Sequence, residues 1–144
     1  MDNTDALKRI REVLLKLHKS LVDQSREEFE AENGPATATQ FLTVLIENKD
    51  YDWLRRFSAL IVDIDEMFAR RDGFEQDEVT ALLEKVKEIA NLNSPDPVFK
   101  DAFNKALATN FDAGKYRKEI VKIIKPGKEV KEKAAKGTAK AAKK

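Results

Sequence analysis

The chain has 144 residues, no Cys and a formal net charge of +1. This length provides room for one domain with a substantial core, and the lack of Cys excludes disulfide and thiolate chemistry, as expected in a reducing cytoplasm. The charges are segregated, because from Lys115 onward there are twelve Lys and Arg against three Glu, a net of +9, which leaves −8 for residues 1–114. We therefore predict a compact acidic body joined to an element that favours anionic surfaces.

Neither the start of the chain nor its apolar runs have the properties of an export or membrane signal. Residues 1–5 are acidic and polar, whereas a secretory signal combines a basic start with an apolar region. No apolar run approaches the roughly 20 residues that a transmembrane helix needs. We expect a soluble cytoplasmic protein without a transmembrane segment.

Two helices are predicted in the first third of the chain, where Gly and Pro separate periodic stretches. Apolar residues at three- and four-residue steps predict a long helix from about Thr4 to Asn33, and Gly34-Pro35 ends it. Thr37 and Gln40 have the spacing of a capping box, in which each side chain bonds the other residue's backbone N–H. A short second helix is expected after Thr37.

Four more helices follow. Asp50 is placed to cap a third helix that ends at Gly73, and its apolar residues fill an arc of roughly 140°, so we expect this helix at the centre of the core. Apolar residues from Val79 to Ile89 predict a fourth helix. Asp96-Pro97 supplies a cap and a first-turn proline for a fifth, and a sixth is predicted from about Asp112 to Lys125.

The fold class follows from the absence of any strand pattern. No segment alternates apolar and polar residues with a period of two between turn signals, so we predict an all-α bundle of five to six helices. Residues 1–125 are assigned to the bundle. Residues 126–144 begin with Pro-Gly and contain too few apolar groups to fold alone, so we predict a flexible, disordered, lysine-rich tail there.

Several short motifs support a resemblance to other proteins. They are Leu-His-Lys at 17–19, Gly-Pro at 34–35, Asp-Trp-Leu-Arg at 52–55 and Leu-Ile-Val-Asp-Ile-Asp-Glu at 60–66. Over roughly residues 12–68 the chain resembles a group of small, functionally uncharacterised bacterial all-helical proteins. The resemblance implies a bacterial cytosolic origin and a helical fold, and it supplies no catalytic residue. The lysine-rich end lies outside it.

His18 is the only histidine, and it lies at the edge of the first apolar stripe. A di-iron bundle needs two Glu-x-x-His pairs, and the residue three positions before His18 is Leu15. No Ser lies in a nucleophile-elbow setting. We expect a hydrogen-bonded histidine at the edge of the core without a catalytic role.

The carboxylates of the third predicted helix are the best candidates for acid and base chemistry, namely Asp63, Asp65 and Glu66. Asp63 and Asp65 lie roughly 160° apart on a helical wheel, so they do not converge on one substrate. Solvated ion pairing is the favoured interpretation, including an i, i+4 pair between Asp52 and Arg56. No phosphate-loop, dinucleotide or calcium-loop motif occurs. We predict a protein that is not an enzyme and has no cofactor and no metal.

A candidate acidic patch lies at the end of the first helix and comprises Glu27, Glu28, Glu30 and Glu32. The helix dipole leaves partial negative charge there, which disfavours each acid by about 0.3–1 kcal/mol. The neutralising groups could be Arg70 and Arg71, a partner protein or the chain's own lysine tail. The alternative is a solvated helix end in which Arg26 pairs with Glu30.

The sixth predicted helix is amphipathic and basic. Tyr116, Ile120, Ile123 and Ile124 share one face, and lysines line the opposite side within about 80°. The candidate anion-contact residues of this helix and the tail are Lys115, Lys118, Lys122, Lys125, Lys128, Lys131, Lys133, Lys136, Lys140, Lys143 and Lys144.

Three functions remain open at this point. The first is an interaction or regulatory module, with an unknown protein partner, that uses the basic helix and tail as an accessory contact surface. The second is a nucleic-acid-associated protein whose tail binds phosphates without reading sequence, although the tail has no aromatic residues to stack on bases. The third is a small-ligand sensor with a pocket around Trp53, Phe57 and Tyr116. A purely solubilising tail and a membrane-surface arm are further interpretations of the lysines.

Overall fold

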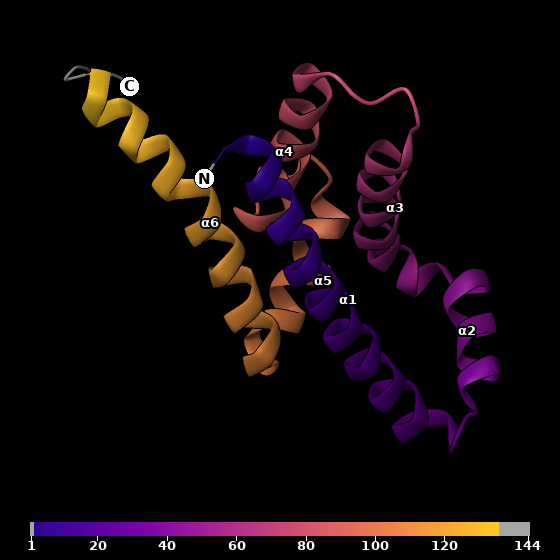
Figure 1. The fold of residues 1–144 in the computed structure, drawn as a ribbon. Helices are drawn as coiled ribbons and strands as arrows, with labels where there is room; N and C mark the ends of the chain where they lie inside the picture. The colour runs from indigo at the N-terminus through magenta and orange to yellow at the C-terminus, as the bar shows by residue number, and fades with distance from the viewer. Residues whose placement is uncertain (1, 136–144) are drawn as a thin grey trace.

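Six α-helices and a short 3-10 helix make up the part of the chain that the structure describes (Figure 1). The computed structural model describes residues 2–135, and for residues 125–135 it describes the backbone alone. The elements are α1 (Asn3–Asn33), α2 (Ala38–Glu47), η1 (Lys49–Leu54), α3 (Arg55–Ala69), α4 (Gln76–Ala90), α5 (Pro97–Thr109) and α6 (Phe111–Ala135). Since no strand occurs between residues 2 and 135, the predicted all-α class is confirmed.

The central element is α1. It packs against α3, α4 and α6, and Figure 1 shows it running beside α6 on one side and α3 on the other. The prediction that the third helix occupies the centre is wrong, because α1 is 31 residues long against 15 for α3 and so reaches along all of its neighbours.

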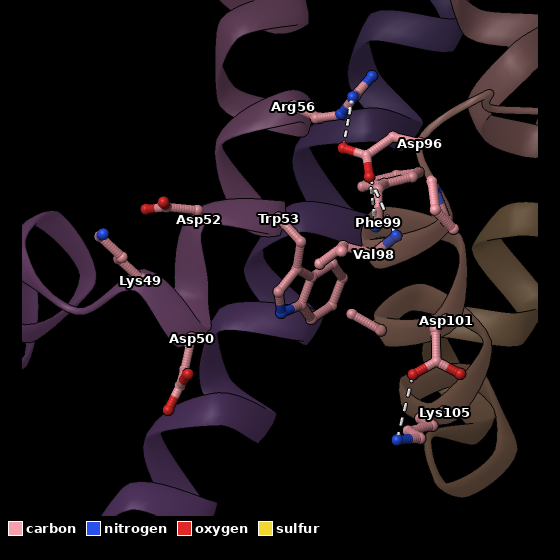
Figure 2. Close-up of a pocket in the computed structure, with 12 residues that line it drawn as sticks. Lys49, Asp50, Asp52, Trp53, Arg56, Asp96, Val98, Phe99, Asp101 and Lys105 are labelled. Carbon is pink, nitrogen blue, oxygen red and sulfur yellow. Dashed lines mark hydrogen bonds and ion pairs between the residues drawn. The ribbon is translucent and has the colours of Figure 1, made fainter.

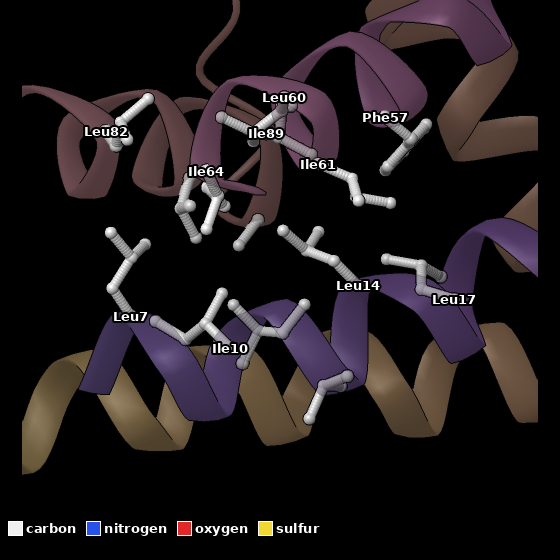
Figure 3. Close-up of a cluster of buried hydrophobic side chains, with 14 of the residues drawn as sticks. Leu7, Ile10, Leu14, Leu17, Phe57, Leu60, Ile61, Ile64, Leu82 and Ile89 are labelled. Carbon is white, nitrogen blue, oxygen red and sulfur yellow. The ribbon is translucent and has the colours of Figure 1, made fainter. Parts of the chain in front are cut away.

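The core forms where the apolar stripe of α1 meets α3 and α4. Figure 3 shows Leu7, Ile10, Leu14 and Leu17 of α1 facing Leu60, Ile61 and Ile64 of α3, with Leu82 and Ile89 of α4 beside them. All of these side chains are at most 8% exposed. Burial of one Leu or Ile side chain contributes about 1.5–3 kcal/mol, so this contact contributes substantially to stability.

The ends of α1 and α2 have the expected chemistry. The Asp2 carboxylate accepts a hydrogen bond from the Asp5 N–H at 2.8 Å and caps α1. Gly34, in the left-handed region with φ of 87°, follows its last residue. The predicted capping box is confirmed, because the Gln40 N–H donates to Thr37 Oγ1 at 3.1 Å and the Thr37 N–H donates to Gln40 Oε1 at 2.8 Å.

The third predicted helix begins and ends differently from the prediction. Its first residues form the 3-10 helix η1, and the N–H of Asp50 donates to Asn48 Oδ1 at 2.9 Å, so Asn48 is the cap and Asp50 is not. Asn and Asp bond the backbone in the same way, so spacing alone did not distinguish them. The helix α3 begins at Arg55 and ends at Ala69, and Gly73 lies in the turn beyond with φ of 86°.

The fifth helix begins as predicted. Asp96 Oδ1 accepts the N–H groups of Val98 and Phe99 at 3.0 and 3.4 Å, and Pro97 occupies the first turn of α5. Proline suits this position because its missing N–H has no helical partner there.

The sixth helix is longer at both ends than predicted. It begins at Phe111 and continues past Pro126 to Ala135, so the predicted end at Lys125 is corrected. Pro126 removes one helical hydrogen bond and Gly127 is a poor helix former, but the φ of proline near −65° matches a helix, and the Lys, Glu and Ala residues from Lys128 onward are strong helix formers. The predicted tail, residues 126–144, therefore begins inside α6, and residues 136–144 lie outside the described part of the chain.

We predict that Phe57→Ala destabilises the protein by about 3–5 kcal/mol in urea unfolding. The Phe57 ring is 0% exposed and lies 5.6 Å from the Phe99 ring and 5.2 Å from the Phe103 ring, so the substitution leaves a cavity between α3 and α5. The matched control is Val62→Ala on the same helix, where the side chain is 50% exposed and the expected loss is within about 0.5 kcal/mol. Equal losses in the two variants would contradict the assigned core.

Candidate interaction surfaces

The lysines of α6 form a continuous exposed face. Lys115, Lys118 and Lys122, here called the lysine face, are exposed, and Ile120 on the opposite side of the helix is 1% exposed. Tyr116, Ile123 and Ile124 pack against the core as half-buried side chains. The predicted amphipathic helix is therefore confirmed. None of the three lysines forms an ion pair with another described residue.

Two polar contacts hold α6 in the rotation that turns these lysines outward. The Arg117 Nε donates to the carbonyl oxygen of Ala90, the last residue of α4, at 2.6 Å. At the start of α6, Asn110 Oδ1 accepts the Ala113 N–H at 3.0 Å, and its amide nitrogen donates to Gln24 Oε1 of α1 at 3.0 Å. Sequence analysis missed both residues. An Asn before a helix is a recognisable cap signal, whereas nothing in the sequence marks Arg117.

Phe111 lies at the start of the lysine face and was also missed. Because Asn110 caps α6, the helix begins at Phe111 and not at Asp112. Steps of four, three and four residues lead from Phe111 to Lys115, Lys118 and Lys122, so all four lie on one stripe of the helix. The Phe111 side chain is 84% exposed.

The neighbouring helix α1 adds two more cations to this side of the molecule. Ser20 of α1 contacts Asn110 at the start of α6, and Lys16 and Arg9 lie four and eleven residues before Ser20 on the same stripe of α1. Both are exposed and, among the described residues, have no ion-pair partner. They therefore border the lysine face.

The other candidate anion contacts are not described as side chains. Lys125, Lys128, Lys131 and Lys133 lie in the part of α6 where the backbone alone is described, and Lys136, Lys140, Lys143 and Lys144 lie outside the described residues. The sequence alone shows that these eight lysines add positive charge to the end of the chain.

The candidate acidic patch divides into internal and exposed members. Glu30 lies 3.5 Å from Arg26, which confirms the predicted Arg26–Glu30 pair. The Glu30 carboxylate also accepts the Ala36 N–H at 2.8 Å, and this bond holds the segment that leads into α2 against the end of α1. Glu27, Glu28 and Glu32 are exposed. Burial, together with the negative charges of Glu28, Asp50 and Glu32, raises the pKa of the Tyr51 hydroxyl. The negative charge near the patch therefore extends to η1, which contains Asp50 and Tyr51.

Arg70 and Arg71 do not neutralise this patch. Arg70 pairs with Glu78 of α4, and Gln76 of α4 donates to Thr4 at 3.3 Å. The turn that carries the two arginines therefore lies near the start of α1, at the opposite end from Glu27–Glu32. The proposed neutralisation by these arginines is wrong.

In the described part of the chain, the lysine tail leads away from the patch. From the contact between Ser20 and Asn110, α6 runs antiparallel to α1 (Figure 1), so Ala135 and Glu32 are separated by about 55 Å at 1.5 Å per residue. The predicted contact between the patch and residues 136–144 lies outside the described part of the chain.

Trp53 lines a cavity, but not with the partners expected from the sequence. A cavity of about 660 Å³ lies between η1 and α5 (Figure 2). Phe57 is buried beneath the Trp53 ring and Tyr116 is on α6, so neither lines it. Most of the cavity's charges are already paired, as in the contact of Lys105 with Asp101 at 3.2 Å.

The predicted Asp52–Arg56 pair is wrong. Asp52 lies 2.9 Å from Arg55, and Arg56 lies 2.8 Å from Asp96 at the start of α5. The guanidinium of Arg56, together with the two capped N–H groups, lowers the pKa of the Asp96 carboxyl. A tertiary partner from α5 thus replaces the local partner that helical spacing suggested.

The carboxylates of α3 face different neighbours. Asp65 pairs with Arg11 of α1, and Asp63 lies 3.8 Å from Lys85 of α4, in agreement with the expectation that they do not converge. Between residues 2 and 135 there is no group of three or more His, Cys, Asp or Glu residues that could hold a metal ion. In the same part of the chain, no helix is long and apolar enough to cross a membrane.

His18 is half-buried, and its ring lies 6.5 Å from the Phe57 ring. Burial disfavours the charged imidazolium and lowers the pKa of His18 below its ordinary value near 6.5. The unfolded chain therefore binds a proton at a higher pH than the folded protein does. Stability is retained above about pH 6.5 and is lost as the pH falls toward the lowered pKa.

We predict that His18→Gln reduces the loss of stability on acidification. The measurement is the free energy of unfolding in urea at about pH 7.5 and about pH 5.5, for wild type and variant. The wild type is expected to lose more than the variant, because Gln binds no proton. An equal loss in both proteins would show that His18 titrates alike in the folded and unfolded states.

Comparisons of the chain with protein-family models, with curated proteins and with solved structures find no match. The resemblance to uncharacterised bacterial helical proteins stays a prediction.

Proposed function

We propose that the chain is a non-enzymatic interaction or regulatory module whose lysine face contacts an anionic partner. The observation that carries the proposal is that Lys115, Lys118 and Lys122 are exposed together and lack ion-pair partners among the described residues. An anionic partner can bind them without breaking a bond within the protein. The eight candidate lysines from Lys125 onward extend the same positive charge along the chain.

The energies of such contacts define the kind of binding expected. One exposed ion pair contributes about 0.2–1 kcal/mol, so an affinity useful to the cell requires several lysines to act together. Salt screens these contacts, since the Debye length is about 8 Å at physiological ionic strength. Binding should therefore be rapid, modest in affinity and strongly dependent on salt.

The cavity beside Trp53 provides weaker support for a ligand-sensing function. Arg56 is paired with Asp96, and Lys105 is paired with Asp101. A polar ligand would have to compete with these pairs. The lysine face has no such competition, so it is the surface on which the proposal rests.

We predict that a triple variant, Lys115→Glu, Lys118→Glu and Lys122→Glu, elutes from a heparin column at clearly lower salt than wild type. Lys and Glu have similar helix propensities, so α6 should remain folded, which circular dichroism checks. The control variant is Lys49→Glu, Lys85→Glu and Lys100→Glu, which has the same net charge and changes exposed lysines on other elements. If both variants elute at the same salt, net charge alone explains retention and the lysine face has no special role.

A further inference from the structure

An almost fully exposed aromatic side chain lies on the lysine face. Phe111 is 84% exposed, which is the highest value for a large apolar side chain in the described part of the chain. Its Cα follows Asn110, whose side chain is held by α1 and by the cap of α6. The ring is therefore presented to solvent from a fixed point on the backbone, although the core gains nothing from it.

We propose that the lysine face and Phe111 together bind single-stranded nucleic acid, with the Phe111 ring stacked on a base and the lysines on phosphates. This inference rests on the proposed function and names its partner. Single-strand binding sites combine a positive surface that follows the backbone with aromatic side chains on which bases stack. Both parts are present on one stripe of α6.

The spacing along α6 suits an extended strand. At a rise of 1.5 Å per residue, the Cα atoms of Lys115, Lys118 and Lys122 follow that of Phe111 by about 6, 10 and 16 Å along the helix axis. Arg9 and Lys16 of α1 border the same stripe. A strand laid along α6 therefore meets the aromatic ring first and then a series of cations.

The composition of this surface favours nucleic acid over a protein partner. The centres of protein interfaces are depleted in Lys and rich in apolar groups, whereas Phe111 is the only exposed large apolar residue on the stripe. Nucleic-acid interfaces are polar and strongly positive. A duplex is less suitable than a single strand because its bases are already stacked on each other and cannot accept the Phe111 ring.

The site should tolerate any sequence. Ring stacking is available to every base, and the side chain of Asn110, which precedes Phe111, is already bonded to Ser20, Gln24 and the Ala113 N–H. It has no free group with which to read the edge of a base. We expect the affinity to depend on the salt concentration and on whether the nucleic acid is single-stranded, and to depend little on base sequence.

The test is fluorescence anisotropy of full-length protein with a labelled oligodeoxythymidylate and with a labelled DNA duplex, over a series of salt concentrations. Phe111→Ala is expected to weaken single-strand binding about 5- to 150-fold without changing the slope of log K against log salt. Phe111→Trp should preserve binding. The control is Leu42→Ala, which removes a 56% exposed apolar side chain from α2 and should have no effect.

The lysine triple variant should change the slope of log K against log salt, which Phe111→Ala leaves unchanged. Loss of three phosphate contacts on a single strand reduces the slope by about 2, which separates the role of the lysines from that of the ring. Equal binding of single strand and duplex, or wild-type affinity in Phe111→Ala, would overturn this inference. Binding to poly-glutamate as tight as to the oligonucleotide would also overturn it, while leaving the proposed contact with an anionic partner in place.

Discussion

The packing of one apolar stripe of α1 against three other helices is the contact on which the rest of the structure depends. Leu7, Ile10 and Leu14 meet α3 and α4, and α6 packs along the same helix. Because α6 buries Ile120 against this core, its opposite side must point to solvent. The exposure of the lysines and of Phe111 is thus a consequence of how the core is filled, and a rotation of α6 would have to expose isoleucines.

Polar contacts between helices determine how each helix is rotated within this packing. Arg117 bonds the end of α4, Arg11 bonds Asp65 of α3, and Arg56 bonds Asp96 at the start of α5. These groups are partly exposed, so each contributes little free energy on its own. Their geometry is nevertheless directional, and it selects one rotation and register among the many in which apolar stripes could pack.

The charge segregation of the sequence becomes a spatial separation in the fold. The acidic end of α1 lies far from the end of α6, and the turn that carries Arg70 and Arg71 lies near the start of α1. Within the described residues, the basic face of α6 and the acidic end of α1 therefore do not neutralise each other. Both surfaces are exposed there, which supports the proposed interaction function.

The sequence by itself determined the number of helices, most of their boundaries and the side of α6 that is buried, because caps, turn residues and helical periodicity act within a few residues of one another. The capping box at Thr37 and the Asp96-Pro97 start of α5 are examples. Only the tertiary structure decided that α1 is central, that Arg56 pairs with Asp96 and that the Phe111 side chain is left 84% exposed. Those outcomes depend on which residues, distant in sequence, become neighbours, and helix spacing carries no information about that.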